Sequence, residues 1–272
     1  MNKYVKYIII GIIAVALLSL LSQSKENIKT FPQRDYTEIM QSGILRAVTE
    51  YNSVSYHANG DSMVGFHYEL LKAFAENNGL SLEVVPIMSM NERMEGINNG
   101  KFDILANDVL ITTDRKDSLL YTHPILLGKQ ILVQRQPINE KDSNFIHSQL
   151  DLAHKTLHIV KGSPHKFRII NLSNEIGDTI YIKEVEKYGT EQLLAMVAHG
   201  DIDYAVCDES IAKSLQKDFP QLHMTTNISF SQFYSWGVNK KNIILLDTLN
   251  TWIEKYTQTQ RFKELKKKYH KE

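Results

Sequence analysis

Apolar runs and helical patterns alternate in the same order in two halves of the chain. In the first half, short apolar strands are expected at 44–48 and 82–85, and residues 65–75 have apolar positions at helical spacing. In the second half, the corresponding strands are expected at 157–160 and 179–183. Each half therefore predicts a β-α-β-α-β order, which is typical of a parallel sheet covered by helices.

One unit of this pattern occurs twice, around Gly100 and around Gly200. Each copy comprises a predicted helix, the glycine, an apolar residue, an aspartate, an apolar strand and a second aspartate, Asp108 or Asp208. Glycine suits the left-handed turn that ends a helix, and a short apolar run suits a strand buried on both faces. Because open parallel sheets bind ligands at the carboxyl ends of their strands, we expect the second aspartates to face each other across a cleft.

The end of the chain predicts a return to the first lobe. A strand is expected at 233–238, followed by two helices. The pattern thus predicts an α/β fold with two lobes: residues 42–134 plus 232–272 form lobe 1, with a last strand at 130–134 before the crossing, and residues 135–231 form lobe 2. Two crossings make a hinge, and a hinge between two lobes makes a cleft that closes on a ligand.

Residues 1–24 have the composition of an export signal, with two lysines, an apolar run at 8–21 and small polar residues up to Ser24. The run is short for a spanning helix, and the cleavage spacing is weak, so a cleaved signal and a retained anchor both stay open. Either outcome places the rest of the chain in the periplasm, released or anchored in the inner membrane, with membrane contact only through this segment. Residues 25–41 are expected to form a linker.

Charge and cysteine content exclude several classes of function. Lys plus Arg and Asp plus Glu both number 31, and this balance argues against nucleic acid as a partner. The single cysteine, Cys207, permits no intrachain disulfide and is expected to be an inert buried thiol. His154 and His158 are four residues apart, but without a third ligand nearby a surface pair is favoured over a metal site. No metal and no cofactor are expected.

Five short motifs follow one another in an order shared with a known family. They are Gly43-Ile44-Leu45-Arg46, Gly65-Phe66-x-Tyr68-Glu69-Leu70, Gly100-Lys101-Phe102-Asp103, Ile111-Thr112-x-Asp114-Arg115-Lys116 and Tyr121-Thr122-x-Pro124. Through them the chain resembles the extracellular solute-binding proteins of family 3 from about Ser42 to Tyr269. The resemblance implies a periplasmic binding protein of the type II two-lobe fold, with a hinge and an interlobe cleft for a polar amino acid.

Two further segments narrow this resemblance. Residues 49–56 lack the usual aromatic-Pro-Pro pattern, and together with Asp203-Tyr204-x-x-x-Asp208 they look more like the N-terminal binding domain of membrane-bound lytic transglycosylase F. In that enzyme the binding domain precedes a lysozyme-like domain that carries a catalytic glutamate. This chain stops at Glu272, so the resemblance implies a binding module without the hydrolase.

The resemblance also implies the roles of three ligand-binding residues. Arg115 aligns with the arginine that grips the ligand's α-carboxylate, and Ser163 aligns with the second-lobe residue that closes on the same group. Asp208 aligns with the acid that pairs with the ammonium group. A planar guanidinium and a helix N-terminus both suit an anion. The plainer alternatives are a surface arginine paired with a neighbouring aspartate, a serine that only caps a helix, and a solvated aspartate.

Other positions depart from the family pattern. Leu110 stands where Ser or Thr commonly contacts the ammonium group, and Asp108 stands where Gly or Ser is usual. Ser53 and Met90 stand where aromatic residues are common. These changes favour a ligand with more positive charge, or a larger one such as a cell-wall peptide, over a standard free amino acid. The complete predicted ligand-binding set is Glu50, Ser53, Met90, Asn107, Asp108, Leu110, Arg115, Ser163 and Asp208.

Two classes of function stay open. The first is a non-catalytic binding protein of the cell envelope, which closes on an amino-acid-like or muropeptide-like ligand. It serves an ABC permease, or it acts as a tethered sensor or as the regulatory partner of a cell-wall enzyme such as a lytic transglycosylase. The second is an enzyme resembling the dehydratases of the same fold, with Glu50, Asp108 or Asp208 as acid or base. We favour the first because fold analogy alone supports the second.

Overall fold

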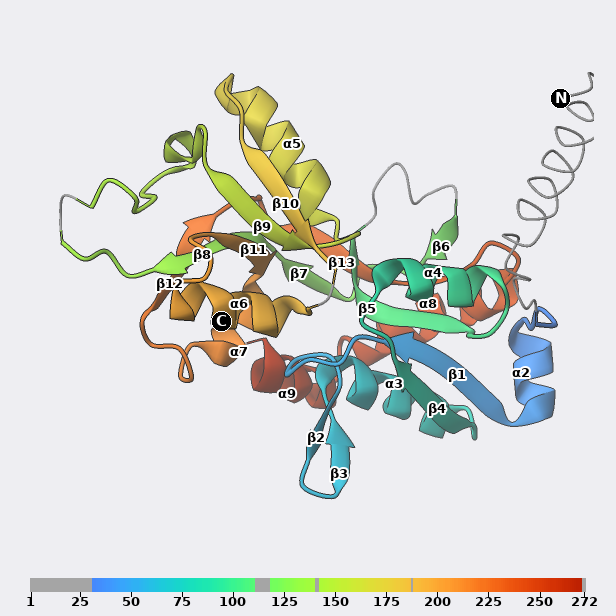
Figure 1. Ribbon diagram of the computed structural model, residues 1–272. Helices are drawn as coiled ribbons and strands as arrows, with labels where there is room; N and C mark the ends of the chain where they lie inside the picture. Colours follow the sequence, from blue (N-terminus) through green and yellow to red (C-terminus); the bar gives the residue numbers. More distant parts are fainter. Residues whose placement is uncertain (1–30, 111–117, 140–141, 187, 271–272) are drawn as a thin grey trace, which may run out of the picture. The chain divides into compact units, whose positions relative to one another are not determined.

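The computed structural model describes residues 31–110, 118–139, 142–186 and 188–270 (Figure 1). The expected export signal at 1–24 lies outside the described residues. Among the described residues, none of the helices combines the length and apolar character needed to cross a membrane.

Two sheets form the centre of the fold, as the alternating pattern predicts. The first sheet has the order β4-β1-β5-β13-β6, with β7 also paired to β13; its strands are β1 Ile44–Thr49, β4 Ser81–Pro86, β5 Ile104–Leu110, β6 Leu119–Tyr121, β7 Leu126–Gly128 and β13 Gln232–Asn239. The second sheet has the order β10-β9-β11-β8-β12; its strands are β8 Gln130–Arg135, β9 Thr156–Val160, β10 Tyr181–Val185, β11 Ala205–Asp208 and β12 Leu222–Asn227. In both sheets the three strands of the β-α-β-α-β run are parallel, which confirms that prediction.

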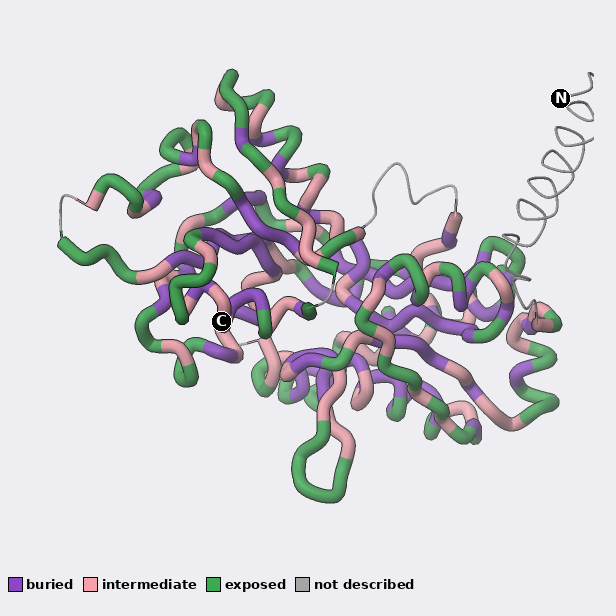
Figure 2. Tube along the Cα trace, viewed as in Figure 1, coloured by how far each residue is buried: buried purple, intermediate pink, exposed green. Residues whose placement is uncertain are grey.

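Helices cover both faces of each sheet. In the first lobe α2 Tyr36–Ser42, α3 Phe66–Asn77, α8 Ile243–Tyr256 and α9 Gln260–Tyr269 share one apolar cluster, and α4 Met90–Asn98 belongs to another. In the second lobe, α5 His165–Ile176 and the short 3-10 helix η1 Gln149–Leu152 contribute to one cluster, and α6 Thr190–His199 and α7 Glu209–Leu215 to a second. Figure 2 shows the buried positions concentrated along the strands.

The crossing between the lobes lies earlier than the sequence analysis placed it. Residues 130–134 were assigned to lobe 1, but β8 pairs antiparallel with β11 and β12 and therefore belongs to the second sheet. This pairing satisfies the backbone groups of β8 on both edges. The chain crosses at Lys129 and returns between β12 and β13, where the backbone N–H of Gln130 donates to the hydroxyl of Ser229 at 2.8 Å. The predicted return of β13, α8 and α9 to the first lobe is confirmed.

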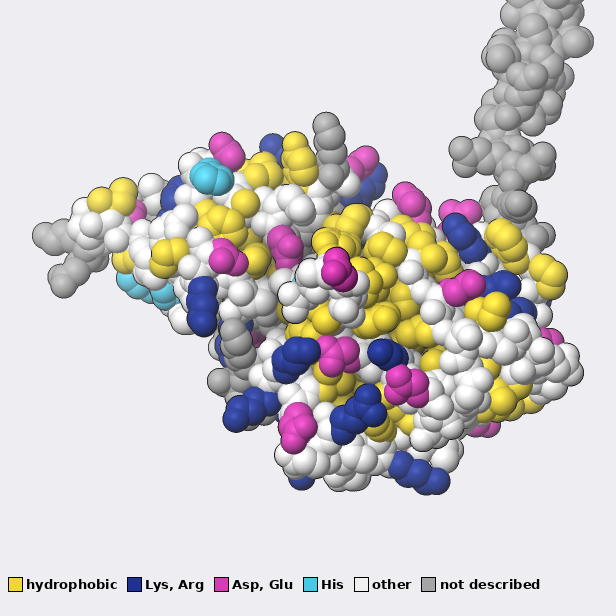
Figure 3. Space-filling view, turned by 90° about the horizontal axis from the view of Figure 1, so that it is seen from below, with side chains coloured by type: hydrophobic (Ala, Val, Ile, Leu, Met, Phe, Trp, Pro, Cys, Tyr) yellow, Lys and Arg dark blue, Asp and Glu magenta, His cyan; other side chains and the backbone are white. Residues whose placement is uncertain are grey.

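The segment expected to be a linker is partly helical. The predicted linker, 25–41, contains most of α2, which starts at a capping box formed by Asp35 and Glu38 and buries Ile39 completely. After β1, a hairpin is formed by β2 His57–Asn59 and β3 Ser62–Val64. On the face shown in Figure 3, basic and acidic side chains lie beside one another, which matches the balanced charge of the chain.

The first aspartate of each repeat copy anchors an arginine. Asp103 accepts from Arg34 Nε at 3.2 Å and Nη2 at 2.5 Å, and from the backbone N–H of Arg46 at 2.8 Å. Asp203 accepts from Arg135 Nη2 at 2.5 Å. The two pairs differ in burial: the side chains of Arg34 and Asp103 are 10% and 2% exposed, whereas those of Arg135 and Asp203 are 39% and 65% exposed.

This difference in burial predicts a difference in stability. Arg34→Ala leaves a buried carboxylate without its bidentate partner, so we expect it to lower the free energy of unfolding by about 3 kcal/mol. Arg135→Ala breaks a solvent-exposed pair and is expected to cost less than about 1 kcal/mol. Chemical denaturation of both variants checks this, and equal losses would contradict the role assigned to burial.

Candidate functional site

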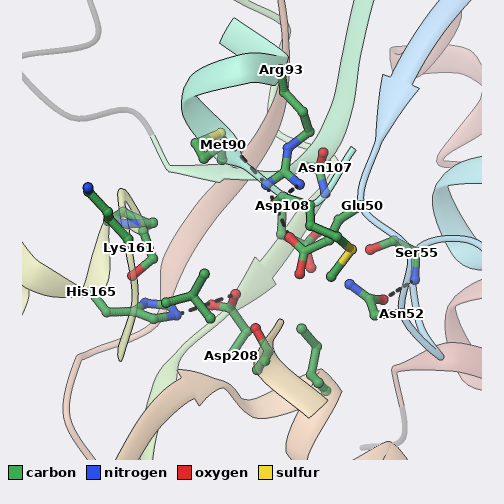
Figure 4. A pocket seen from close by; sticks show the side chains of 16 residues that line it. Glu50, Asn52, Ser55, Met90, Arg93, Asn107, Asp108, Lys161, His165 and Asp208 are labelled. Carbon is green, nitrogen blue, oxygen red and sulfur yellow. Dashed lines mark hydrogen bonds and ion pairs between the residues drawn. The ribbon is translucent and has the colours of Figure 1, made fainter. Parts of the chain in front are cut away.

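A cavity with about 50 Å³ of enclosed space, partly open to solvent, lies between the two lobes (Figure 4). Side chains from both sheets and from the starts of α4, α5, α6 and α7 line it. They are Glu50, Asn52, Ser55, Met88, Met90, Arg93, Asn107, Asp108, Val160, Lys161, Ser163, Pro164, His165, Thr190, Asp208 and Ile211.

Six residues of the predicted set line this cavity, and two of the described ones do not. The six are Glu50, Met90, Asn107, Asp108, Ser163 and Asp208. Ser53 instead bridges the lobes: its backbone N–H donates to Glu191 Oε1 at 2.7 Å and its hydroxyl lies 2.6 Å from that of Ser214. Leu110 is buried and lines a separate hollow with Gln130. Arg115 lies outside the described residues.

Asp108 is held by a network that starts in the core of the first lobe. The indole N–H of Trp236 donates to His67 Nδ1 at 3.0 Å, and His67 Nε2 lies 3.1 Å from Asp108 Oδ1. Because an indole can only donate, Nδ1 is the acceptor, and the imidazole therefore presents its proton on Nε2 to the carboxylate. Burial favours a raised pKa for Asp108, but the neighbouring imidazoles of His67 and His270 and the hydrogen bond from His67 bring this pKa below its ordinary value.

Asp208 has the opposite electrostatic setting. Burial, the charge of Asp108 and the charge of Glu50 raise the pKa of Asp208 to about 8, although the hydrogen bond from the Tyr234 hydroxyl lowers it. His165 Nε2 lies 4.0 Å from Asp208 Oδ2. Tyr234 belongs to the first sheet and Asp208 to the second, so their hydrogen bond joins the lobes at the hinge. A Cβ on Gly128 would come within 2.1 Å of the Tyr234 ring, so the glycine makes room for it.

The arginine that lines the cavity, Arg93, makes its hydrogen bonds to groups of the protein. Arg93 Nη2 pairs with Glu50 Oε2 at 3.1 Å, and Nη1 donates to the carbonyl oxygens of Ile87 at 2.5 Å and Met88 at 3.1 Å. The side chain of Arg93 is 3% exposed. These contacts fix the first turn of α4 against the loop after β4 and neutralise Glu50.

The start of α5 faces the cavity but differs in detail from the prediction. The plainer alternative for Ser163, helix capping, does not occur: Pro164 is the N-cap residue and no side chain makes a capping bond. The buried Ser163 hydroxyl has no hydrogen-bond partner in the described part of the chain. The geometry arises because Gly162 turns the backbone at a φ of +73° and points the serine toward the cavity wall.

Sequence reasoning missed several residues around these carboxylates. His67 occupies the unassigned position of the Gly65-Phe66-x-Tyr68 motif, and only the fold brings it to Asp108. Tyr234 lies in a strand that reads only as apolar, and Arg93 lies in a helix that reads as solvated. His165 follows Ser163-Pro164 directly, and its place at a helix start facing the cleft was the one signal available in the sequence.

The histidine pair and the cysteine lie away from this cavity. His158 is buried and its Nδ1 lies 3.2 Å from the carbonyl oxygen of Tyr204, so the expectation of a surface pair is wrong for this residue. His154 lies 3.4 Å from Asp178. In the described ranges there is no group of three side chains placed to hold a metal ion. Cys207 is fully buried, as predicted, and burial raises its pKa well above the ordinary value.

The two-lobe architecture and its central cavity match a known family. The family model of the bacterial extracellular solute-binding proteins, family 3, matches residues 45–272. The chain belongs to this family.

Relatives among curated proteins carry the name membrane-bound lytic murein transglycosylase F. The protein from Photobacterium profundum is 28% identical over 84% of this chain and 43% of its own length. The protein from Pseudomonas putida (strain KT2440 among its designations) is 23% identical over 95% of this chain and 52% of its own length. The chain thus spans about half the length of the curated relatives it matches.

Solved structures of amino-acid-binding proteins share the fold. A mutant of the arginine-binding protein ArgBP from T. maritima has a TM-score of 0.73 at 21% identity and covers 87% of this chain and 99% of its own. An ancestral arginine-binding protein bound to arginine has a TM-score of 0.72 at 23% identity, covering 84% and 98%. An ancestral arginine-binding protein bound to glutamine also has a TM-score of 0.72 at 23% identity, and the match covers 85% of this chain and 99% of that chain. The predicted type II two-lobe fold is confirmed.

The setting of Asp208 makes the stability of this solute-binding fold depend on pH. The folded protein keeps the Asp208 proton up to about pH 8, whereas the unfolded chain releases it near 3.8. Between these values the folded state binds more protons, so this residue lowers the free energy of unfolding as the pH rises. Asp208→Asn is neutral at every pH and still accepts from Tyr234. We expect it to raise the Tm at pH 8 by about 3 °C or more.

Thermal unfolding of the wild type and Asp208→Asn at pH 5 and pH 8 measures this effect. The gain should be larger at pH 8 than at pH 5. An equal gain at both values would show that Asp208 ionises normally in the fold.

Proposed function

We propose that this chain is a non-catalytic binding module of the cell envelope whose two lobes close on a small amino-acid-like ligand or a cell-wall peptide. The observation that carries the proposal is the cavity itself, because Asp108 from the first lobe and Asp208 from the second enclose one space at the hinge. A cleft built from two hinged α/β lobes binds by closing around its ligand.

Contacts between the two lobes beside the cavity support a binding motion in which the lobes close on the ligand. Ser53 bridges to Glu191 and Ser214 on the opposite lobe. A Cβ on Gly189 would come within 2.4 Å of Met88 Cε, and one on Gly162 would come within 3.1 Å of Asn91 Oδ1. The two glycines therefore permit the close approach of the first lobe to the starts of α5 and α6.

The amino-acid-like class has support from the solved structures, which bind arginine and glutamine. In this chain, Asp208 is the partner for the ligand's ammonium group, and the start of α5 with Ser163 faces its carboxylate. Arg115 is retained as the proposed carboxylate partner on the strength of its motif. Family membership implies a location in the cell envelope, and we place the module in the periplasm, released or anchored.

The partner of the module follows from its relatives. Their name is that of a lytic murein transglycosylase, which favours a tethered sensor or the regulator of a cell-wall enzyme over service to an ABC permease. A cell-wall peptide is then the ligand that such a regulator would read. We propose no nucleic-acid partner, no metal and no cofactor.

An enzyme on the same fold is the second candidate. One observation favours it, because a buried carboxyl whose pKa lies near 8 suits an acid or base. The pKa of Asp108 moves in the opposite direction, and Glu50 is neutralised by Arg93, so the cleft supplies one such group instead of the pair that we expect for a dehydratase.

Calorimetry of the full chain against amino acids and cell-wall peptides tests the binding function. We expect saturable binding that Asp208→Asn weakens by about tenfold or more, because an amide cannot ionise to pair with the ligand's ammonium group when the ligand binds. Arg115→Ala is expected to weaken it similarly. Asp203→Asn, at the first aspartate of the same repeat copy but outside the cavity, should bind as the wild type does. Absence of binding across the whole panel would refute the proposal.

A further inference from the structure

The charged groups around the cavity are neutralised to different degrees. Glu50 and Arg93 pair with each other, and Lys161 at the rim pairs with Glu186. Asp108 has only the Nε2 proton of His67 within hydrogen-bond distance among the described residues. Because His67 Nδ1 accepts the indole N–H of Trp236, the imidazole in this arrangement carries one proton, on Nε2. Asp108 therefore brings a net negative charge into the cavity.

Asn107 adds a second, independent feature beside this charge. The residue is 6% exposed, it lines the cavity, and its Oδ1 has no hydrogen-bond partner in the described ranges. Buried amide oxygens are normally satisfied, so one without a partner marks a place for a donor that the protein does not supply. A half-turn of the amide about its last torsion exchanges its oxygen and nitrogen and brings the oxygen to face a ligand. Figure 4 shows Asn107 and Asp108 together on the same wall.

The opposite wall carries Asp208, the proposed ammonium partner, with His165 beside it (Figure 4). Met88 and Met90 line the cavity in addition to these polar groups. Thioether side chains adapt to the shape of an alkyl chain. The cavity thus offers a carboxylate on each lobe and an apolar surface.

We propose that Asp108 and Asn107 form a second cation subsite, so that the ligand is an aliphatic amino acid or peptide end with two cationic groups. The α-ammonium group meets Asp208, and the side-chain cation meets Asp108 and the Asn107 carbonyl, while the alkyl chain lies along the methionines. This assignment rests on the proposed function of the cleft as an amino-acid site and names its ligand class. Diamino acids, free or within a cell-wall peptide, have this chemistry.

L-Lysine and L-norleucine test the subsite because they share the aliphatic chain and differ by the terminal ammonium group. With the full chain in calorimetry, we expect the wild type to bind L-lysine at least about tenfold more tightly than L-norleucine. Asp108→Asn keeps an acceptor for His67 but removes the charge. It should bring the two affinities to within about threefold of each other by weakening L-lysine alone. Asp203→Asn, on the surface of the second lobe, should retain the wild-type preference.

The outcomes separate the two proposals. Binding of L-norleucine or L-glutamine as tight as that of L-lysine by the wild type overturns the second subsite and leaves the binding function intact. An unchanged preference in Asp108→Asn also overturns it. If neither cationic nor neutral amino acids nor cell-wall peptides bind, the proposed function fails and the subsite with it. Should Asp108→Asn fail to fold, the wild-type comparison of the two ligands decides.

Discussion

Two carboxylates enclosed in one cavity repel each other, and the packing around the hinge is organised by this constraint. Asp108 keeps its charge with a hydrogen bond from His67, which Trp236 orients from the core of the first lobe. The repulsion, together with burial, raises the pKa of Asp208, so that Asp208 retains its proton to about pH 8. Since Tyr234 from the first sheet donates to Asp208 in the second, the same arrangement also ties the two lobes together.

The repeat separates structural from ligand-facing acid in both halves of the chain. Asp103 and Asp203 precede their strands, and each pairs with an arginine of its own lobe. The charges of these two aspartates are therefore neutralised within the lobes. Asp108 and Asp208 lie on the strands themselves and face the cavity. One local pattern therefore supplies both an anchor for each lobe and one side of the binding cleft. The aspartate before each strand is the anchor, and the aspartate at the carboxyl end of the strand faces the cleft.

Much of the architecture was predictable because it depends on local patterns. Alternating apolar strands and helices located the parallel strands of both sheets, and the glycines located the helix ends. Strand β8 could not be assigned from its own residues, because an apolar strand fits either lobe and only its antiparallel partners decide between them. Helix α2 was missed although Asp35 and Glu38 form a local capping box, because the helix has only seven residues and buries a single one of them, Ile39.

The candidate site was predictable only in part, for a similar reason. The strand-end rule located Asp108 and Asp208, and the helix-start rule located Ser163. Their partners come from distant positions: His67 lies 41 residues before Asp108, and Tyr234 lies 26 residues after Asp208. Ser53 was assigned to the ligand by position, yet its polar groups are engaged with the opposite lobe. Side-chain pairs across the fold, which a linear pattern does not specify, determine the electrostatics of the cleft.

The most direct measurement of this account is the number of protons released when a cationic ligand binds. Calorimetry of L-lysine binding at pH 7 in buffers of different ionisation enthalpy gives that number. If Asp208 is protonated in the empty cleft and pairs with the ligand's ammonium group when filled, the account predicts release of about one proton. Binding of L-lysine without proton release would contradict it, because the two carboxylates would then both be ionised before the ligand arrives.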